Sequence, residues 1–239
     1  MEISRRTLPY PEPQITLGDI TLSTSISRKY LGIMLSANLN WNDHVTTVIR
    51  KATRMIAITR KLRNSLTKNA LTTFYKLYIR PILEYASTTW CNLTQTQSGR
   101  LERCQRRAAR LIIGMSLFQH IRHGELLSSA KLASLSSRRK LALALLGHQL
   151  YYKNAPPHLQ QVTFPERVTP YSLRNTQSFA LPTARTTSYQ DSVILRSLEI
   201  FSSLPFDIKG FKSFSRFKRA AAEQLLSQKC DCSSLPYIH

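Results

Sequence analysis

The sequence predicts a mainly α-helical protein that begins with a small β-hairpin and continues into a partly irregular, helical C-terminal extension. Three patterns support this fold class. Apolar and polar residues alternate around Gly18-Asp19, apolar residues recur every three or four positions over residues 42–113, and five of the 11 prolines fall between Pro156 and Pro182. With 239 residues, the chain is long enough to bury a hydrophobic core.

The strand pattern occupies the first 35 residues. Leu17 and Ile20 fall opposite one another across a two-residue turn that starts with Gly18, and Ile15 and Leu22 form the next pair. A second apolar run over residues 30–35 contains a glycine. This glycine marks either a bulge or a place where another backbone comes close.

Three helical runs follow the strands. The first starts at Asn42, which is the expected N-cap. The second starts after Thr67, and Pro81 must kink or end it because proline has no amide hydrogen. The third covers residues 99–113 and is closed by Gly114, a typical C-terminal cap.

The C-terminal half mixes helical and irregular patterns. Residues 125–152 predict one or two leucine-rich helices interrupted at 136–140, and a last amphipathic helix starts near Ser213. A Pro/Ser/Thr-rich segment at 153–192 predicts extended or loop structure. The expected domains are a hairpin region at 1–40, a basic helical region at 41–118, and a C-terminal helical extension at 119–239.

The charge of the chain indicates a polyanionic partner. It contains 34 Lys and Arg against 13 Asp and Glu, for a formal charge of +21. Residues 50–110 alone hold 14 basic residues against Glu84 and Glu102, and the arginines of the third helical run share one arc of that helix, apart from its apolar residues. Phosphate contact is therefore favoured over a merely solvated cationic face. The candidate nucleic-acid-binding residues are Arg50, Lys51, Arg54, Lys61, Arg100, Arg103, Arg106, Arg107 and Arg110.

Aromatic residues alternate with basic residues at two places, 74–90 and 211–219. Such a mixture permits stacking on unpaired bases. The helical spacing of these aromatics instead favours core positions for most of them.

Other classes of function find little support. No apolar stretch is long enough to span a membrane and the N-terminus has no secretory apolar core, so we expect an intracellular protein, nuclear or cytoplasmic, with no membrane partner. Cys230-x-Cys232 with His239 lacks a fourth zinc ligand, and His120 and His123 are expected to form a surface pair. We expect neither a metal nor a cofactor.

Several segments, in order, resemble reverse transcriptases of LINE-type (non-LTR) retrotransposons. The first is residues 28–35, with Leu39, Trp41 and His44 after it. Residues 75–86 with Trp90 resemble a helix of that family's thumb, and residues 101–112 resemble the basic helix that follows it. Further segments resemble the downstream extension of jockey-like elements: 138–141, 155–159, 171–174, and Leu204-Pro205 with Phe214 and Phe217.

The resemblance implies specific roles for these segments. The strand at 29–35 would correspond to the primer grip, which holds the 3′ end of the growing strand, with Lys29, Tyr30, Leu31 and Gly32 as the primer-grip-like residues. Residues 42–113 would form the thumb, which lies along the template–primer duplex. The implied partners are that duplex, element RNA or target DNA, and the palm of the parent polymerase.

The resemblance does not extend to catalysis. Polymerases of this family hold two metal ions on palm aspartates that include an adjacent Asp-Asp pair, whereas the five aspartates of this sequence are all isolated. We therefore expect the C-terminal part of a polymerase, without independent catalysis and without catalytic residues. Three alternatives stay open: a free-standing basic helical module that binds RNA or DNA, a cationic interaction protein that meets acidic protein or lipid, and a fragment with no selected function.

Overall fold

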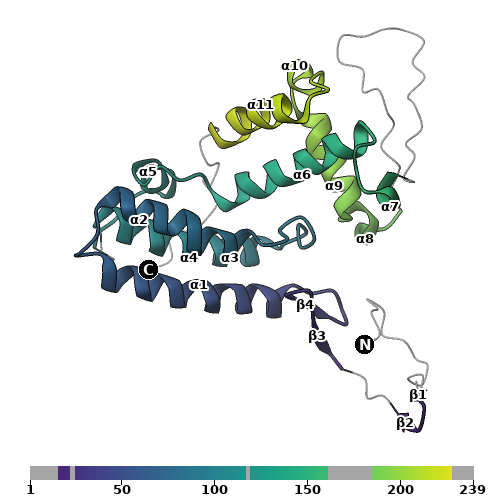
Figure 1. The fold of residues 1–239 in the computed structure, drawn as a ribbon, viewed down its shortest axis with the longest axis horizontal. Coiled ribbons are helices and arrows are strands. Elements are labelled where there is room, and N and C mark those ends of the chain that lie inside the picture. Colours follow the sequence, from purple (N-terminus) through teal and green to yellow (C-terminus); the bar gives the residue numbers. More distant parts are fainter. Residues whose placement is uncertain (1–15, 22–24, 117–118, 161–184, 228–239) are drawn as a thin grey trace.

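The structure, a computed structural model, describes residues 16–21, 25–116, 119–160 and 185–227. Helices dominate it, and two small antiparallel hairpins precede them (Figure 1). The predicted fold class, mainly α with an N-terminal hairpin, is confirmed. The first hairpin joins β1 (Thr16–Leu17) to β2 (Ile20–Thr21) with the predicted pairing of Leu17 and Ile20. The predicted pairing of Ile15 with Leu22 lies outside the described residues.

The second hairpin joins β3 (Ser27–Tyr30) to β4 (Ile33–Ser36). Tyr30 pairs with Ile33, so Leu31 and Gly32 form a two-residue turn. Their φ angles are 45° and 86°, and positive φ at both positions is the mark of a type I′ turn. Gly32 is therefore a turn residue, and the bulge considered for it is not present. Leu31 takes the left-handed conformation at a cost of about 1–2 kcal/mol, because its Cβ crowds the following carbonyl.

Four helices and one π-helical turn build the first helical group: α1 (Asn42–Leu62), α2 (Lys68–Phe74), η1 (Tyr75–Ile79), α3 (Arg80–Glu84) and α4 (Gln95–Ile113). The predicted start of a helix after Thr67 is confirmed, and the Thr67 hydroxyl caps it by accepting from the Ala70 amide. The predicted cap Gly114 is also confirmed, with a φ of 80°. The predicted cap at Asn42 is wrong by one position. Trp41 occupies the N-cap without a side-chain hydrogen bond.

Pro81 lies near the start of α3, directly after the π-helical turn. The chain therefore changes its helical geometry just before the proline and does not stop there. Proline fits this place because the first turn of a helix leaves its amide groups without intrahelical partners. The predicted interruption is real, and it takes the form of the η1 turn.

The C-terminal half consists of α5 (His123–Ser129), α6 (Leu135–Tyr151), α7 (Pro157–Gln160), α8 (Thr187–Gln190), α9 (Val193–Ser203), α10 (Phe206–Lys209) and α11 (Phe214–Ser227). The interruption expected at 136–140 falls instead at 130–134, because the Ser134 hydroxyl accepts from the Ser137 amide and so caps α6. Of the Pro/Ser/Thr-rich segment, residues 161–184 lie outside the described residues.

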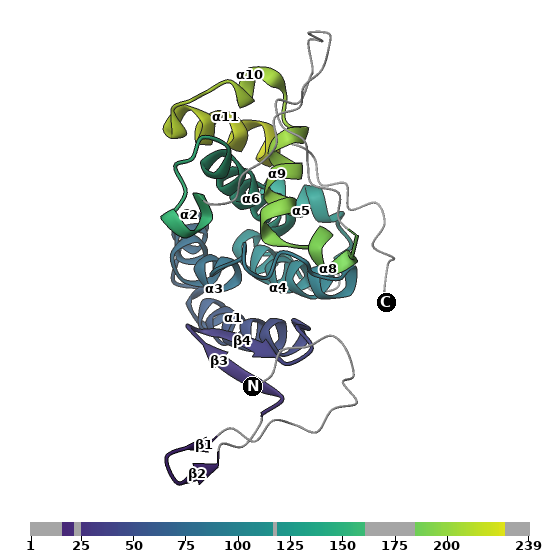
Figure 2. The same ribbon diagram turned by 90° about the vertical axis from the view of Figure 1, so that its right-hand side faces the viewer.

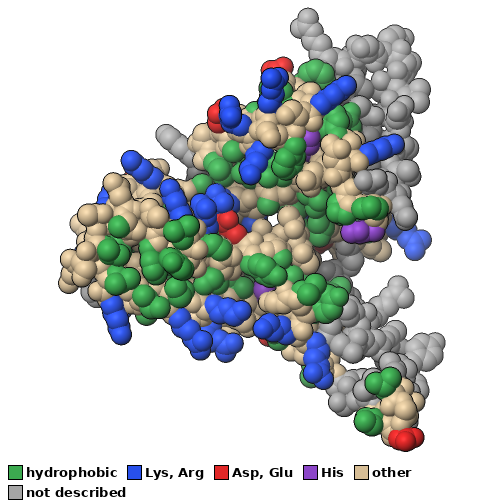
Figure 3. Space-filling model, in the orientation of Figure 1, with side chains coloured by type: hydrophobic (Ala, Val, Ile, Leu, Met, Phe, Trp, Pro, Cys, Tyr) green, Lys and Arg blue, Asp and Glu red, His purple; other side chains and the backbone are tan. Residues whose placement is uncertain are grey.

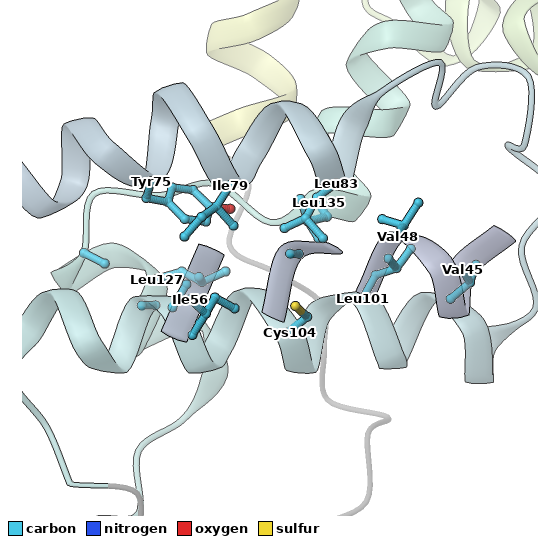
Figure 4. Packing of buried hydrophobic residues seen from close by; sticks show 14 of the residues in the cluster. Val45, Val48, Ile56, Tyr75, Ile79, Leu83, Leu101, Cys104, Leu127 and Leu135 are labelled. Atoms are coloured by element: carbon cyan, nitrogen blue, oxygen red, sulfur yellow. The ribbon is translucent and has the colours of Figure 1, made fainter. Parts of the chain in front are cut away.

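Two hydrophobic cores support these helices. The first lies between α1, the α2–η1–α3 segment, α4 and α5, with Val48, Ile79 and Leu101 at its centre (Figure 4). The second lies between α6, α9 and α11. Helices α1 and α11 lie at opposite ends of the helical part of the molecule (Figures 1 and 2). Among the described residues, no helix is both long enough and apolar enough to cross a membrane.

Candidate nucleic-acid interface

Helices α1 and α4 pack side by side and run in the same direction. Two hydrogen bonds join the starts of the helices: Gln97 Nε2 donates to Asn42 Oδ1 at 2.8 Å, and Arg100 Nη2 donates to Thr46 Oγ1 at 2.8 Å. A third joins the residues that follow their C-terminal ends, where Arg63 Nη2 donates to Gly114 O at 3.0 Å. A capping box of Thr94 with Gln97 fixes the start of α4. The two helices therefore present one continuous side, held in register from end to end.

The apolar sides of both helices face the first core, which leaves their basic sides turned outward. In α1, Arg50, Lys51, Arg54 and Lys61 are exposed. Lysine and arginine side chains gather along the edge of the molecule formed by α1 (Figure 3). The periodicity that buries Val45, Ala52 and Ile56 is what sets these cations outside.

The five arginines of α4 differ in their surroundings. Arg103 and Arg107 are exposed, and Arg100 is half-buried beside Thr46 of α1. Arg106 and Arg110 are also half-buried and interact within the fold; Arg110 Nη2 donates to Gln119 O at 3.2 Å. The structure thus brings all nine predicted cations onto two neighbouring helices. We call seven of them the α1–α4 basic surface: Arg50, Lys51, Arg54, Lys61, Arg100, Arg103 and Arg107.

The two acidic residues of the stretch 50–110 point elsewhere. Glu84 binds the guanidinium of Arg138 on α6 through both carboxylate oxygens, one of them at 2.9 Å from Nη2. Glu102 accepts from the Ser136 amide at 2.8 Å and lies 3.3 Å from His123 Nε2. Within the described part of the chain, no ion pair joins a carboxylate to the α1–α4 basic surface. Its positive charge is therefore not neutralised by the fold.

The histidine pair predicted for the surface is only half correct. His120 is exposed, whereas the His123 side chain is 9% exposed and faces Glu102. The described residues contain no group of three His, Cys, Asp or Glu side chains that could hold a metal ion. Cys230, Cys232 and His239 lie outside the described residues.

The primer-grip-like residues lie at the tip of the β3–β4 hairpin. Lys29 and Tyr30 end β3, and Leu31 and Gly32 form the turn, with Leu31 75% exposed. Tyr85, which follows α3, donates from its hydroxyl to Leu31 O at 3.0 Å. Its ring lies 3.2 Å from where a Cβ on Gly32 would be, so a larger residue would press on it. Tyr85 therefore docks the turn onto the helices.

Sequence reasoning did not assign this role to Tyr85, because 54 residues separate it from its partner Leu31. A second contact fixes the other strand of the hairpin: the Met34 amide donates to His44 Nδ1 at 3.3 Å. Burial, and then the charge of Lys51, lower the pKa of His44, which keeps its ring neutral and able to accept that hydrogen bond. The hairpin and α1 thus form one anchored unit.

Comparison with known proteins finds similarity to a transposon polymerase. The "Probable RNA-directed DNA polymerase from transposon X-element" of Drosophila melanogaster is 27% identical over 125 residues. The match covers 51% of this chain and 14% of the relative, so the chain spans only a small part of that protein's length. No protein-family model and no solved structure matches. The similarity indicates a reverse-transcriptase-related region.

Proposed function

We propose that this chain is the nucleic-acid-binding C-terminal part of a LINE-type, jockey-like reverse transcriptase, and that it does not polymerise by itself. In this proposal residues 1–40 are a primer-grip remnant, 41–118 a basic thumb and 119–239 a C-terminal extension. The observation that carries the proposal is the α1–α4 basic surface, whose cations have no carboxylate partners among the described residues. The similarity to a transposon polymerase supports the choice of nucleic acid as the polyanion.

The dimensions of the surface suit a duplex backbone. From Arg50 to Lys61 the axis of α1 advances about 16 Å, at about 1.5 Å per residue. Each strand of a duplex carries one phosphate per about 3.4 Å of the duplex axis, so this length of axis corresponds to about five phosphates per strand. Neutralising five phosphates gives an affinity slope of about −4.5 against the logarithm of salt concentration.

The hairpin tip adds a second element to the proposal. Lys29, Tyr30, Leu31 and Gly32 form an exposed, tightly turned tip that Tyr85 holds in place. Tyr30 and Leu31 are 65% and 75% exposed, so the tip is open to contact with a strand end. We infer that this tip contacts the 3′ end of a primer, next to the duplex on the α1–α4 basic surface.

Fluorescence anisotropy with a labelled RNA–DNA hybrid, a DNA duplex and a single strand tests the proposal. In the purified chain, exchange of Arg50, Arg54, Arg103 and Arg107 for Gln should reduce the salt slope for duplexes by up to about 3.6, since each phosphate contact contributes about 0.9. A matched control changes four exposed cations in and just before α11 (Lys212, Arg216, Lys218 and Arg219) to Gln, which should leave the slope for duplexes unaltered.

Each outcome separates the proposal from its alternatives. Tighter binding to the hybrid than to single strands supports a thumb, because a thumb follows duplex shape and backbone. Equal affinity for heparin and anionic vesicles would instead favour a cationic interaction protein. A primer-extension assay should give no product, and a product would overturn the claim that the chain lacks independent catalysis.

A further inference from the structure

In the second aromatic and basic segment, residues 211–219, one phenylalanine side chain is buried and two are partly exposed. Phe217 is fully buried in the second core, as its helical spacing predicts. Phe211 and Phe214 stay 36% and 37% exposed, and Phe206 on the neighbouring α10 stays 63% exposed. Three phenylalanine rings thus remain accessible to solvent within one short stretch of chain.

The segment from α10 to the start of α11, which carries these rings, is anchored by side chains near the end of α6. His148 of α6 and Tyr152, which follows α6, bind the backbone of this segment: the Tyr152 hydroxyl donates to Lys209 O at 2.9 Å, and His148 Nε2 lies 2.8 Å from Phe211 O. Lys209 Nζ in turn donates to Ser202 O at 2.9 Å. The fully buried side chain of His148 therefore anchors the backbone of an exposed loop. Such anchoring lowers the entropy lost when the loop binds a ligand.

Four exposed cations accompany the rings: Lys212, Arg216, Lys218 and Arg219. Among the residues that the structure describes, none of the four forms an ion pair with a carboxylate. Asp207 and Glu223 are the acidic residues of α10 and α11. The local charge is therefore positive, as binding to a phosphate backbone requires.

We propose that this region is a second nucleic-acid-binding surface, specific for single strands, on which unpaired bases stack while phosphates meet the cations. We call it the α11 surface and define it by Phe206, Phe211, Phe214, Lys212, Arg216, Lys218 and Arg219. Accessible rings favour a single strand, because paired bases cannot offer their faces. A membrane is disfavoured, because the apolar side of α11 is already packed against α6 through Phe217, Ala221 and Leu225.

Helices α10 and α11 lie at one end of the helical part of the molecule and α1 at the other, with α4 between them (Figures 1 and 2). A duplex on one surface therefore leaves the other accessible, and the chain can hold two nucleic-acid segments at once. The inference does not depend on the thumb assignment, because it stands on different residues. The two surfaces can be tested separately with reciprocal variants.

The test uses the full chain and two fluorescein-labelled 12-mers, one of uridylate and one of thymidylate. Exchange of Phe206 and Phe211 for Ala should weaken binding by about fivefold or more for each ring that stacks. Exchange of the four cations for Gln should reduce the single-strand salt slope by up to about 2.8, since each phosphate contributes about 0.7. Tyr189→Ala, an exposed aromatic of α8, is the control and should leave affinity unchanged.

Competition completes the test. Unlabelled duplex at saturation should leave the labelled single strand bound, and the Gln variant of Arg50, Arg54, Arg103 and Arg107 should still bind it. Displacement by duplex, or loss of single-strand binding in that variant, would overturn the second surface. So would displacement by polyglutamate of equal charge, which would identify an acidic protein as the partner. Because Phe206 is mostly exposed, Phe206→Ala alone retains the core and repeats the measurement if the double variant unfolds.

Discussion

Gly147 lies where α6 crosses α9, and an alanine there should destabilise the second core. A Cβ atom on Gly147 would lie 2.4 Å from Ser197 O and 2.7 Å from Phe201 Cβ. Both neighbours belong to buried residues of α9. Since one obstacle is a backbone carbonyl, a change of rotamer cannot relieve the contact. The helices must move apart.

The size of the effect follows from this geometry. Ordinary van der Waals contact begins at 3.4 Å, so α9 must retreat by about 1 Å from Gly147. Forcing extra volume into a packed core costs about 1–3 kcal/mol. The better helix propensity of alanine returns at most about 1 kcal/mol. We expect the free energy of unfolding to fall by about 1–2 kcal/mol, which lowers the melting temperature by about 2–8 °C for a chain of this size.

Urea and thermal unfolding, followed by circular dichroism, measure this loss. Gly124→Ala in α5 is the matched control, because a Cβ there meets nothing within 4 Å. It should be as stable as the parent or slightly more stable. A Gly147→Ala chain with the parent's melting temperature would refute the close crossing of α6 and α9. Because α11 packs on α6, we also expect weaker single-strand binding by the variant and unchanged duplex binding.

Three further predictions concern stability. Leu31→Asn should raise the free energy of unfolding by about 1 kcal/mol, because Asn tolerates the left-handed turn; an unchanged urea midpoint would contradict strain at Leu31. Lowering the pH from 7.5 to 5.5 should destabilise the fold, because burial lowers the pKa of His44 and His148 in the folded chain. Below about pH 6.5 the unfolded chain therefore binds more protons at these histidines than the folded chain does. A urea midpoint that does not fall would show that these rings accept a proton in the fold. Glu84→Gln should cost about 1–2 kcal/mol in urea by breaking the pair with Arg138 while sparing duplex affinity, and a loss of that affinity would place Glu84 in the interface.

Local chemistry made much of the fold predictable. The helices follow from the spacing of apolar residues, and the caps at Thr67 and Gly114 follow from hydroxyl and glycine chemistry that acts within a few residues. The type I′ turn at Leu31 was not predictable, because leucine disfavours positive φ. The break before α6 was misplaced, because the serines after residue 134 look like a loop until Ser134 is known to cap the helix.

The candidate site was predictable only in part. Exposed cations on amphipathic helices can be identified from spacing, because a charged side chain is rarely buried without a partner. The parallel pairing of α1 with α4 depends on contacts more than 50 residues apart in the sequence, such as Arg100 with Thr46. The role of Tyr85 and the exposure of Phe206 also depend on distant partners and needed the structure.

The placement of Glu84 and Glu102 explains why the positive charge of the first helical group lies on its outer side. Glu84 and Glu102 both bind groups of α5 or α6, so two of the three acids of the first helical group, all but Asp43, serve to join it to the C-terminal half. Had they lain on the outer sides of α1 and α4, they would have neutralised cations there and weakened any attraction for phosphate. The same carboxylates that connect the two halves therefore leave the outer basic side unopposed. Joining the halves and binding a polyanion are two consequences of one arrangement of charge.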